Sequence, residues 1–216
     1  TMLCIVGLIN AVNMIDGIDG LAGGFALTAS LWMGAAAVLH GDSGLMLLIG
    51  LLGSAVAGFL AFNLRHPWRA HASVFLGDGG SMTLGFALAY FAIHLAARED
   101  AVLAPMSIAW ILGLPAIDAV SLMVRRLVKG GSPFLADREH LHHILLRAGF
   151  SDAQTAAILL GVAFFMGAVG FFGGYWGWSE SWMFAGFLGM TGLHVLAVLY
   201  AWRSAKVLRR LTGKLQ

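Results

Sequence analysis

Charged residues are scarce in this sequence. Only 11% of the 216 residues are Asp, Glu, Lys or Arg, and 59% are hydrophobic, whereas about 25% of the residues in a soluble domain are charged. Such a chain cannot cover its surface with polar groups, so the composition excludes an ordinary water-soluble domain and indicates that lipid is the solvent. The formal net charge of +2 is too small to indicate a surface that binds nucleic acid.

Cysteine is almost absent. The single cysteine, Cys4, excludes an intramolecular disulfide and a zinc site built on cysteines. Because Cys4 lies in an apolar run, we expect it to be a small buried residue. No basic segment and no cleavage site precede that run, so it is not read as a signal peptide.

Long apolar runs make up most of the chain. A short run at 2–12 forms a stub, and six further runs reach the roughly 20 residues that a membrane-spanning helix needs. These six runs are 21–39, 44–63, 80–97, 101–124, 153–174 and 182–202. The sequence therefore predicts an all-α fold, a polytopic integral membrane helix bundle that forms one domain over residues 1–216.

The connections between the runs differ in charge. Of the 13 Lys and Arg residues, all except Arg98 lie in one alternating set of connections. Cytoplasmic loops carry the excess of Lys and Arg in membrane proteins. The charge pattern therefore predicts that residues 64–79, 125–151 and 203–216 lie on the cytoplasmic side.

Four hydrogen-bonding side chains interrupt the apolar sequence in "NAVNMIDGIDGLAGG". Asn10, Asn13 and Asp16 recur every three residues, so a helix would place them near one face, and Asp19 continues this spacing past Gly17. Amide and carboxylate oxygens are ligands that Mg²⁺ and Mn²⁺ prefer. Ionisable groups at a membrane helix end indicate a functional site. The alternative is a capped and solvated helix terminus.

A second polar motif, "VFLGDGGSMTLGF", occupies residues 74–86. It places one carboxylate, Asp78, among three glycines, and Ser81 stands at the start of the next apolar run. We expect Ser81 to cap the N-terminus of the following helix, whose positive end would face an anion. The alternative is a glycine-rich turn with an ordinary cap.

The third motif, "SPFLADREHLHHILLRAGF", covers residues 132–150. Arg138, His140, His142 and His143 are typical of a donor set for phosphate and sugar oxygens. We expect them in a cytoplasmic loop that contributes little to packing. A solvated basic loop and a zinc site are the alternatives, and zinc is disfavoured because three histidines within four residues do not converge easily on one ion.

Asp118 is a further carboxylate inside an apolar run. We expect it to lie in a helix near the cytoplasmic side and to pair with Arg125 or Arg126. This role would be structural rather than catalytic.

The three motifs, in this order, resemble the polyprenyl-phosphate N-acetylhexosamine-1-phosphate transferases of glycosyltransferase family 4. The segment "DREHLHH" is most similar to the bacterial branch that transfers N-acetylglucosamine-1-phosphate to undecaprenyl phosphate. The sister branch that transfers phospho-MurNAc-pentapeptide typically has three adjacent histidines there, and Leu141 interrupts such a run in this sequence.

The resemblance implies a reaction and a location. A sugar-1-phosphate would pass from a UDP-N-acetylhexosamine, with N-acetylglucosamine favoured, to undecaprenyl phosphate, releasing UMP in the first step of a cell-envelope polysaccharide such as the O-antigen of lipopolysaccharide. The expected cofactor is Mg²⁺ or Mn²⁺. The expected location is the bacterial inner (plasma) membrane, multi-pass, with the active site facing the cytoplasm. The partners would be these substrates and membrane lipid, without nucleic acid, and a homodimer is retained as one arrangement.

The resemblance also assigns roles to individual residues. Asn13 and Asp78 correspond to metal ligands, and Asn10 and Asp16 would line the catalytic site around the metal and the diphosphate. Asp19 corresponds to a nucleotide-contacting position near the uracil. The residues that would face the diphosphate and the sugar are Arg138, His140, His142 and His143.

One departure from the family pattern concerns an adjacent pair of aspartates. Full-length members carry this pair on an earlier cytoplasmic loop, and no Asp-Asp pair occurs in these 216 residues. We therefore expect N-terminal helices of the family fold to be missing from this sequence and the chain alone to have little activity. The alternative functions are an inactive remnant of the transferase and a transporter with an ion site at a broken helix, which the one-sided placement of the polar motifs disfavours.

Overall fold

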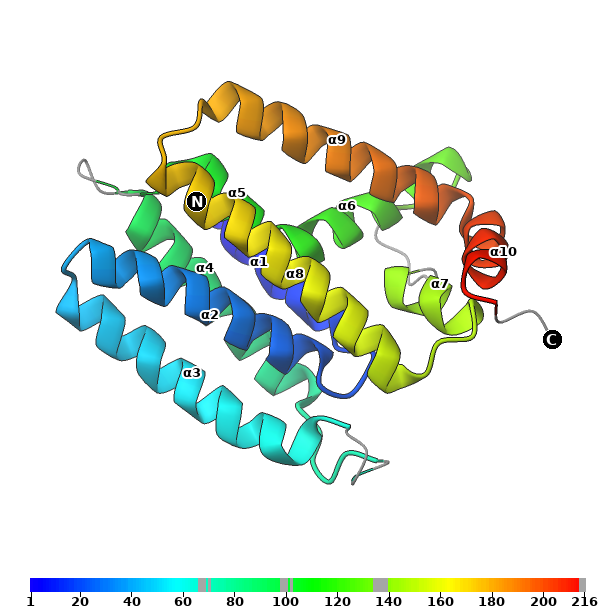
Figure 1. The fold of residues 1–216 in the computed structure, drawn as a ribbon, viewed down its shortest axis with the longest axis horizontal. Helices are drawn as coiled ribbons and strands as arrows, with labels where there is room; N and C mark the ends of the chain where they lie inside the picture. The colour runs from blue at the N-terminus through cyan, green and yellow to red at the C-terminus, as the bar shows by residue number, and fades with distance from the viewer. Residues whose placement is uncertain (66–68, 70, 98–100, 102, 134–139, 214–216) are drawn as a thin grey trace.

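The structure, a computed structural model, describes residues 1–65, 69, 71–97, 101, 103–133 and 140–213. Within these residues the regular structure consists of α-helices packed side by side (Figure 1). The helices are α1 Met2–Ile15, α2 Leu21–Leu39, α3 Ser43–Asn63, α4 Gly77–Ala96, α5 Pro105–Ile111, α6 Gly113–Val128, α7 Leu141–Arg147, α8 Asp152–Tyr175, α9 Glu180–Leu199 and α10 Ala201–Leu211.

Five helices in the described part of the chain are long and apolar enough to cross a membrane, namely α2, α3, α4, α8 and α9. A sixth span results if α5 and α6 are counted together. These helices begin and end within a few residues of the predicted runs, because the length of an apolar run directly sets the length of a spanning helix. The prediction of an all-α polytopic membrane bundle is confirmed.

The run 101–124 was predicted as one continuous span, and this is wrong in detail. The described helices there are α5 and α6, whose axes differ in direction by 80°. Pro115 explains the break, because its ring clashes with the carbonyl of the residue four positions earlier, Ile111, and it has no N–H to donate. α5 ends at Ile111, and the next helix begins at Gly113.

The core is formed where α2 meets α3, α4 and α8, and where α1 packs along α4. Phe25, Met33 and Leu88 are fully buried there. The backbones of α1 and α4 approach closely at Gly85, where an added Cβ atom would lie 2.7 Å from the Cα of Ile9. Such contacts between small residues and a neighbouring backbone are a common way for helices to pack in lipid.

Cys4 is exposed, so the prediction of a buried cysteine is wrong. The first buried residue of α1 is Leu8, and residues 1–4, which include Cys4, are all exposed. An apolar residue can face outward in a lipid-embedded bundle without the penalty that water would impose.

The connections sort to two ends of the bundle (Figure 1). One end holds the α2–α3 turn and the α8–α9 turn. The other end, here called the polar end, holds the turn 16–20, the start of α4, α7 and α10. All three polar motifs of the sequence therefore meet at one end of the helices.

Candidate functional site

The first element of the site joins the end of α1 to the start of α4. The Nδ2 of Asn13 donates to Asp78 Oδ1 at 3.1 Å and to Ser81 Oγ at 2.9 Å. Asn13 is half-buried, Asp78 is exposed and Ser81 is fully buried. The two residues expected to bind a metal are thus neighbours in space, although 65 positions separate them in sequence.

Ser81 does not cap α4, which corrects the sequence-based expectation. The helix begins at Gly77, and no side chain caps its N-terminus. Ser81 lies one turn inside the helix, with its Oγ 3.2 Å from the carbonyl oxygen of Gly77. Asp78 therefore stands in the first turn, where the positive end of the helix dipole favours a carboxylate.

Asp16 follows directly after α1, which ends at Ile15. Partial burial, together with the negative charges of Asp78 and Asp19, raises the pKa of Asp16 to about 6. Asp16 is therefore close enough to Asp78 and to Asp19 to be repelled by both carboxylates. Because the helix stops before Gly17, Asp19 does not continue the helical face of Asn13 and lies instead in the turn 16–20.

Asp19 is paired with a cation. Arg65 Nε donates to Asp19 Oδ2 at 2.7 Å, and Arg65 Nη1 lies 2.5 Å from Oδ2 of Asp152, the first residue of α8. The guanidinium thus ties the turn after α1 to the start of α8. The sequence analysis did not identify Arg65 or Asp152 as site residues. The only sequence signal at Arg65 was the basic character of residues 64–79.

Asn63 fixes the backbone around Asp19 and Asp78. Its Oδ1 accepts from the backbone N–H of Gly20 at 2.7 Å, and its Nδ2 donates to the carbonyl oxygen of Val74 at 2.8 Å. Gly20 has a φ of +82°, which favours glycine. Asn63 is buried at the end of α3 and carried no sequence signal beyond its polarity within an apolar run.

The histidine-rich motif is anchored by Asp118. His140 Nδ1 lies 2.7 Å from Asp118 Oδ2, and the backbone N–H of Leu141 donates to Asp118 Oδ1 at 3.1 Å. His194 Nε2 is 3.3 Å from the same Oδ1. The expected pairing of Asp118 with Arg125 or Arg126 is wrong, because the carboxylate points toward α7 and α9 rather than along α6.

His142 connects this motif to the turn after α1. It is 3% exposed, and a Cβ atom added to Gly17 would lie 2.7 Å from its Nε2. The ring centroid lies 5.3 Å from that of His140 and 4.1 Å from that of His143. Burial, followed by the neighbouring His143 and His140, lowers the pKa of His142 to about 3, so the ring is neutral at pH 7.

These contacts show that the described part of the histidine-rich motif is packed into the protein. His140 and His142 are buried and residues 141–147 form α7, so this part of the motif is neither a solvated loop nor a segment without packing. Among the residues that the structure describes, no group of three or more His, Cys, Asp or Glu side chains could hold a metal ion. Arg138 lies outside the described residues.

Asn10 takes no part in the contacts around Asp78. It is exposed on α1, and its Nδ2 donates to the carbonyl oxygen of Val6 at 2.7 Å within its own helix. The structure therefore brings together Asn13, Asp16, Asp19 and Asp78, with His142 beside them, but does not bring Asn10 into that group.

The donor set fits a hard divalent cation. Asp16 and Asp78 supply carboxylates, and Asn13 has its amide nitrogen on Asp78, which leaves its carbonyl oxygen as a ligand atom. Mg²⁺ is commonly bound by one or two carboxylates, with substrate phosphates and water in the remaining positions. A site with few protein ligands, at the exposed Asp78, matches that pattern.

Comparison with known proteins finds one family model and a set of relatives that share one name. Residues 1–96 match the glycosyl transferase family 4 model. Over its whole length the chain is 31% identical to the undecaprenyl-phosphate alpha-N-acetylglucosaminyl 1-phosphate transferase of Escherichia coli (strain K12) and 32% identical to the protein of that name from Salmonella typhi. The chain is therefore similar to glycosyl transferase family 4 over residues 1–96 and to these transferases over its whole length.

The family model and the relatives match different lengths of the chain. The chain spans 59% of the length of the E. coli and Salmonella relatives. The relative of the same name from Pasteurella multocida (strain Pm70) is 33% identical over 73% of the chain and 44% of its own length. The family model covers Asn13, Asp16, Asp19 and Asp78, whereas the histidines lie only in the region matched by the relatives.

Proposed function

We propose that the protein transfers a sugar-1-phosphate, specifically N-acetylglucosamine-1-phosphate, from a UDP-sugar to undecaprenyl phosphate and releases UMP. The names of its relatives support the acceptor and the sugar phosphate. The observation that carries the proposal is the meeting of Asn13, Asp16 and Asp78 with His142 at one end of a membrane bundle. We also propose that this end faces the cytoplasm of a bacterial inner membrane and that the product feeds a cell-envelope polysaccharide.

The reaction joins two anions. An oxygen of the lipid phosphate attacks the β-phosphorus of the UDP-sugar, and the bond between that phosphorus and the bridging oxygen breaks, with UMP as the leaving group. The lipid tail requires a site that opens to the membrane, and a site at the end of a helix bundle meets this requirement. Repulsion between the reactants must be offset by positive charge and hydrogen-bond donors.

A bound Mg²⁺ or Mn²⁺, held by Asp78, Asp16 and the amide oxygen of Asn13, would supply charge stabilisation to the diphosphate. Arg65 fixes the carboxylate of Asp19 by a hydrogen bond, so that Asp19 has a defined position for a nucleotide base. His142 stays neutral because of its burial and can donate one N–H to a phosphate or sugar oxygen. The contact between Asp118 Oδ2 and His140 Nδ1 fixes the position of the His140 ring.

The proposal is tested by measuring transfer of labelled sugar phosphate from UDP-N-acetylglucosamine to undecaprenyl phosphate. The protein should include the residues that the relatives have beyond this chain. Asp78→Asn should lower the rate at least a hundredfold, since removing one charged stabilising group costs several kcal/mol in the transition state. Asp42→Asn is the matched control, because Asp42 caps α3 at the opposite end of the bundle and asparagine caps equally well.

Three outcomes decide the matter. Loss of activity in Asp78→Asn with an active Asp42→Asn variant supports the proposal. Equal activity in both variants would show that Asp78 only shapes the start of α4. Absence of transfer by the unmodified protein to any polyprenyl phosphate, from any UDP-N-acetylhexosamine, would refute the proposed reaction.

A further inference from the structure

The last described helix, α10, has a strongly basic exposed side. Residues 200–213 contain no Asp or Glu, and Arg203, Lys206, Arg209 and Arg210 are all exposed. With 3.6 residues per turn these four cations spread over about a third of the circumference of the helix. Net positive charge on one face of a helix indicates a negatively charged partner.

The opposite side of α10 is fixed to the protein. Ala201 and Ala205 are 3% exposed and pack in a cluster with Ile144 and Ala148, which lie on and next to α7. The contact places the basic side of α10 next to Arg147, the last residue of α7. The guanidinium of Arg147 lies over the Trp202 ring, 4.4 Å from its centroid.

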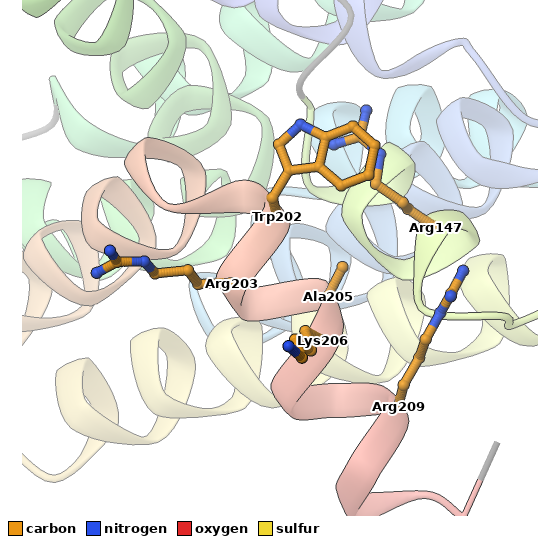
Figure 2. Close-up of a pocket in the computed structure, with 6 residues that line it drawn as sticks. All are labelled: Arg147, Trp202, Arg203, Ala205, Lys206 and Arg209. Carbon is orange, nitrogen blue, oxygen red and sulfur yellow. The ribbon is translucent and has the colours of Figure 1, made fainter. Parts of the chain in front are cut away.

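Together these side chains border a surface hollow of about 450 Å³ (Figure 2). Figure 2 shows Arg147 beside Trp202 and Arg209 to the right of α10, with Arg203 directed to the left. We call this surface the basic hollow. It is lined by Arg147, Trp202, Arg203, Ala205, Lys206 and Arg209.

The position of the basic hollow relative to the membrane follows from chain continuity. α9 is apolar enough to cross a membrane, and only Tyr200 separates its last residue, Leu199, from α10. Figure 1 shows that α10 turns away from the direction of α9. α10 therefore lies at the surface of the bilayer, where headgroups are found.

The exposed apolar residues of α10 agree with this position. Trp202 is 71% exposed and Leu211 is 78% exposed, as expected for side chains that meet lipid rather than water. Tryptophan is enriched at membrane–water interfaces. A helix that combines cations with exposed Trp and Leu is typical of segments that lie in the interface plane and bind anionic lipid.

We infer that the basic hollow binds the headgroup phosphate of an anionic phospholipid of the surrounding leaflet. Arg203, Lys206 and Arg209 supply the positive charge, and Trp202 contacts the upper part of the acyl chains. The hollow lies at the C-terminal end of α7, whereas His142 of the candidate active site is near the N-terminal end of that helix. The inference therefore concerns a separate surface and does not rest on the proposed function.

The test measures lipid binding to the purified chain in neutral detergent, by native mass spectrometry with phosphatidylglycerol and phosphatidylcholine at equal concentrations. Phosphatidylglycerol should bind at least about fivefold more tightly, since one Lys or Arg near anionic lipid contributes about this factor. Lys206→Gln should weaken phosphatidylglycerol binding about fivefold. The triple variant R203Q/K206Q/R209Q should bind both lipids equally.

Lys129→Gln is the matched control, because Lys129 is an exposed lysine that ends α6 and does not line the hollow. It should leave phosphatidylglycerol binding unchanged. Unchanged unfolding temperatures are expected for both single variants, since both lysines are exposed.

The inference is overturned if the unmodified chain binds both phospholipids equally, or if Lys129→Gln weakens binding as much as Lys206→Gln does. It is also overturned if polyprenyl phosphate displaces phosphatidylglycerol at lower concentrations than phosphatidylglycerol itself requires. In that case the hollow would take the substrate lipid rather than a bulk phospholipid.

Discussion

Asp118 is 3% exposed and accepts hydrogen bonds from His140 Nδ1 and from the backbone of Leu141. One carboxylate of α6 thus holds the N-terminus of α7, and with it the ring stack that includes His142. A buried pair of this kind is expensive to break from one side, because the remaining partner stays buried without its counterpart.

Asp118→Ala should therefore lower the free energy of unfolding by about 3–5 kcal/mol. Asp118→Asn should lower it by less, since the amide oxygen can still accept from Leu141 or His140. Thermal unfolding of both variants in detergent checks the difference. Equal stability of Asp118→Ala and the unmodified chain would contradict the anchoring role.

Asp16 makes cation binding depend on pH. Its pKa is raised to about 6, so the carboxyl is mostly protonated below that value and must lose its proton to bind a cation. Without a cation, the stability that the protonated form provides is lost as the pH rises through about 6. Mn²⁺ affinity should therefore rise with pH, and at pH 5 it should be about tenfold weaker than well above the pKa.

Electron paramagnetic resonance titration with Mn²⁺ between pH 5 and pH 8 measures this dependence. Asp16→Asn should bind Mn²⁺ more weakly and with a flatter pH profile, because the titrating group is gone. A flat profile in the unmodified chain would remove Asp16 from the expected ligand set.

The backbones of α1 and α4 come into close contact at Gly85. A Cβ atom at Gly85 would lie 2.7 Å from Ile9 Cα and 3.1 Å from the carbonyl oxygen of Leu8. Gly85→Ala must therefore push the two helices apart, and overpacking of this kind costs about 1–3 kcal/mol. The same displacement would separate Asn13 from Asp78.

Thermal unfolding in detergent should show a lower midpoint for Gly85→Ala. Gly58→Ala on α3 is the control, since an added Cβ meets nothing within 4 Å there. It should be neutral or slightly stabilising, because alanine is the better helix former. Equal midpoints for both variants would show that α1 and α4 tolerate a wider spacing.

The elements that sequence patterns predicted best are the spanning helices. The run 21–39 coincides with α2, because unbroken apolar length is a local property of the chain. The start of α4 was misplaced, since Gly79 and Gly80 suggest a turn although tertiary contacts hold them in the helix. The bend at Pro115 could be suspected locally, but its angle of 80° depends on the packing of α5 and α6 against different neighbours.

The whole molecule is predicted to have a fixed orientation in the membrane. The start of α3 and the end of α6 lie at opposite ends of the bundle (Figure 1). In a Cys4→Ser background, Ser43→Cys should react with a membrane-impermeant maleimide in intact cells, and Lys129→Cys should react only after lysis. The reverse pattern would place the polar end outside the cytoplasm and contradict the proposed access to a UDP-sugar.

For the whole chain, the amino-acid sequence alone was enough to predict the membrane class, the helix lengths and the candidate polar residues. Hydropathy, charge and residue chemistry are local properties, and they identified Asn13, Asp16 and Asp78 before any fold was known. The family resemblance added roles to these residues, but neither source of information contains distances.

Which of these residues lie next to one another depends on the packing of the helices. In the structure Asn13 donates a hydrogen bond to Asp78, 65 positions away, and Asp19 pairs with Arg65. Asp118 contacts His140 rather than a neighbouring arginine. Asn10 lies outside the group, although its spacing matched that of Asn13. The physical reason is that hydrogen bonds and ion pairs form between atoms a few ångströms apart, and helix packing sets those separations independently of position in the sequence.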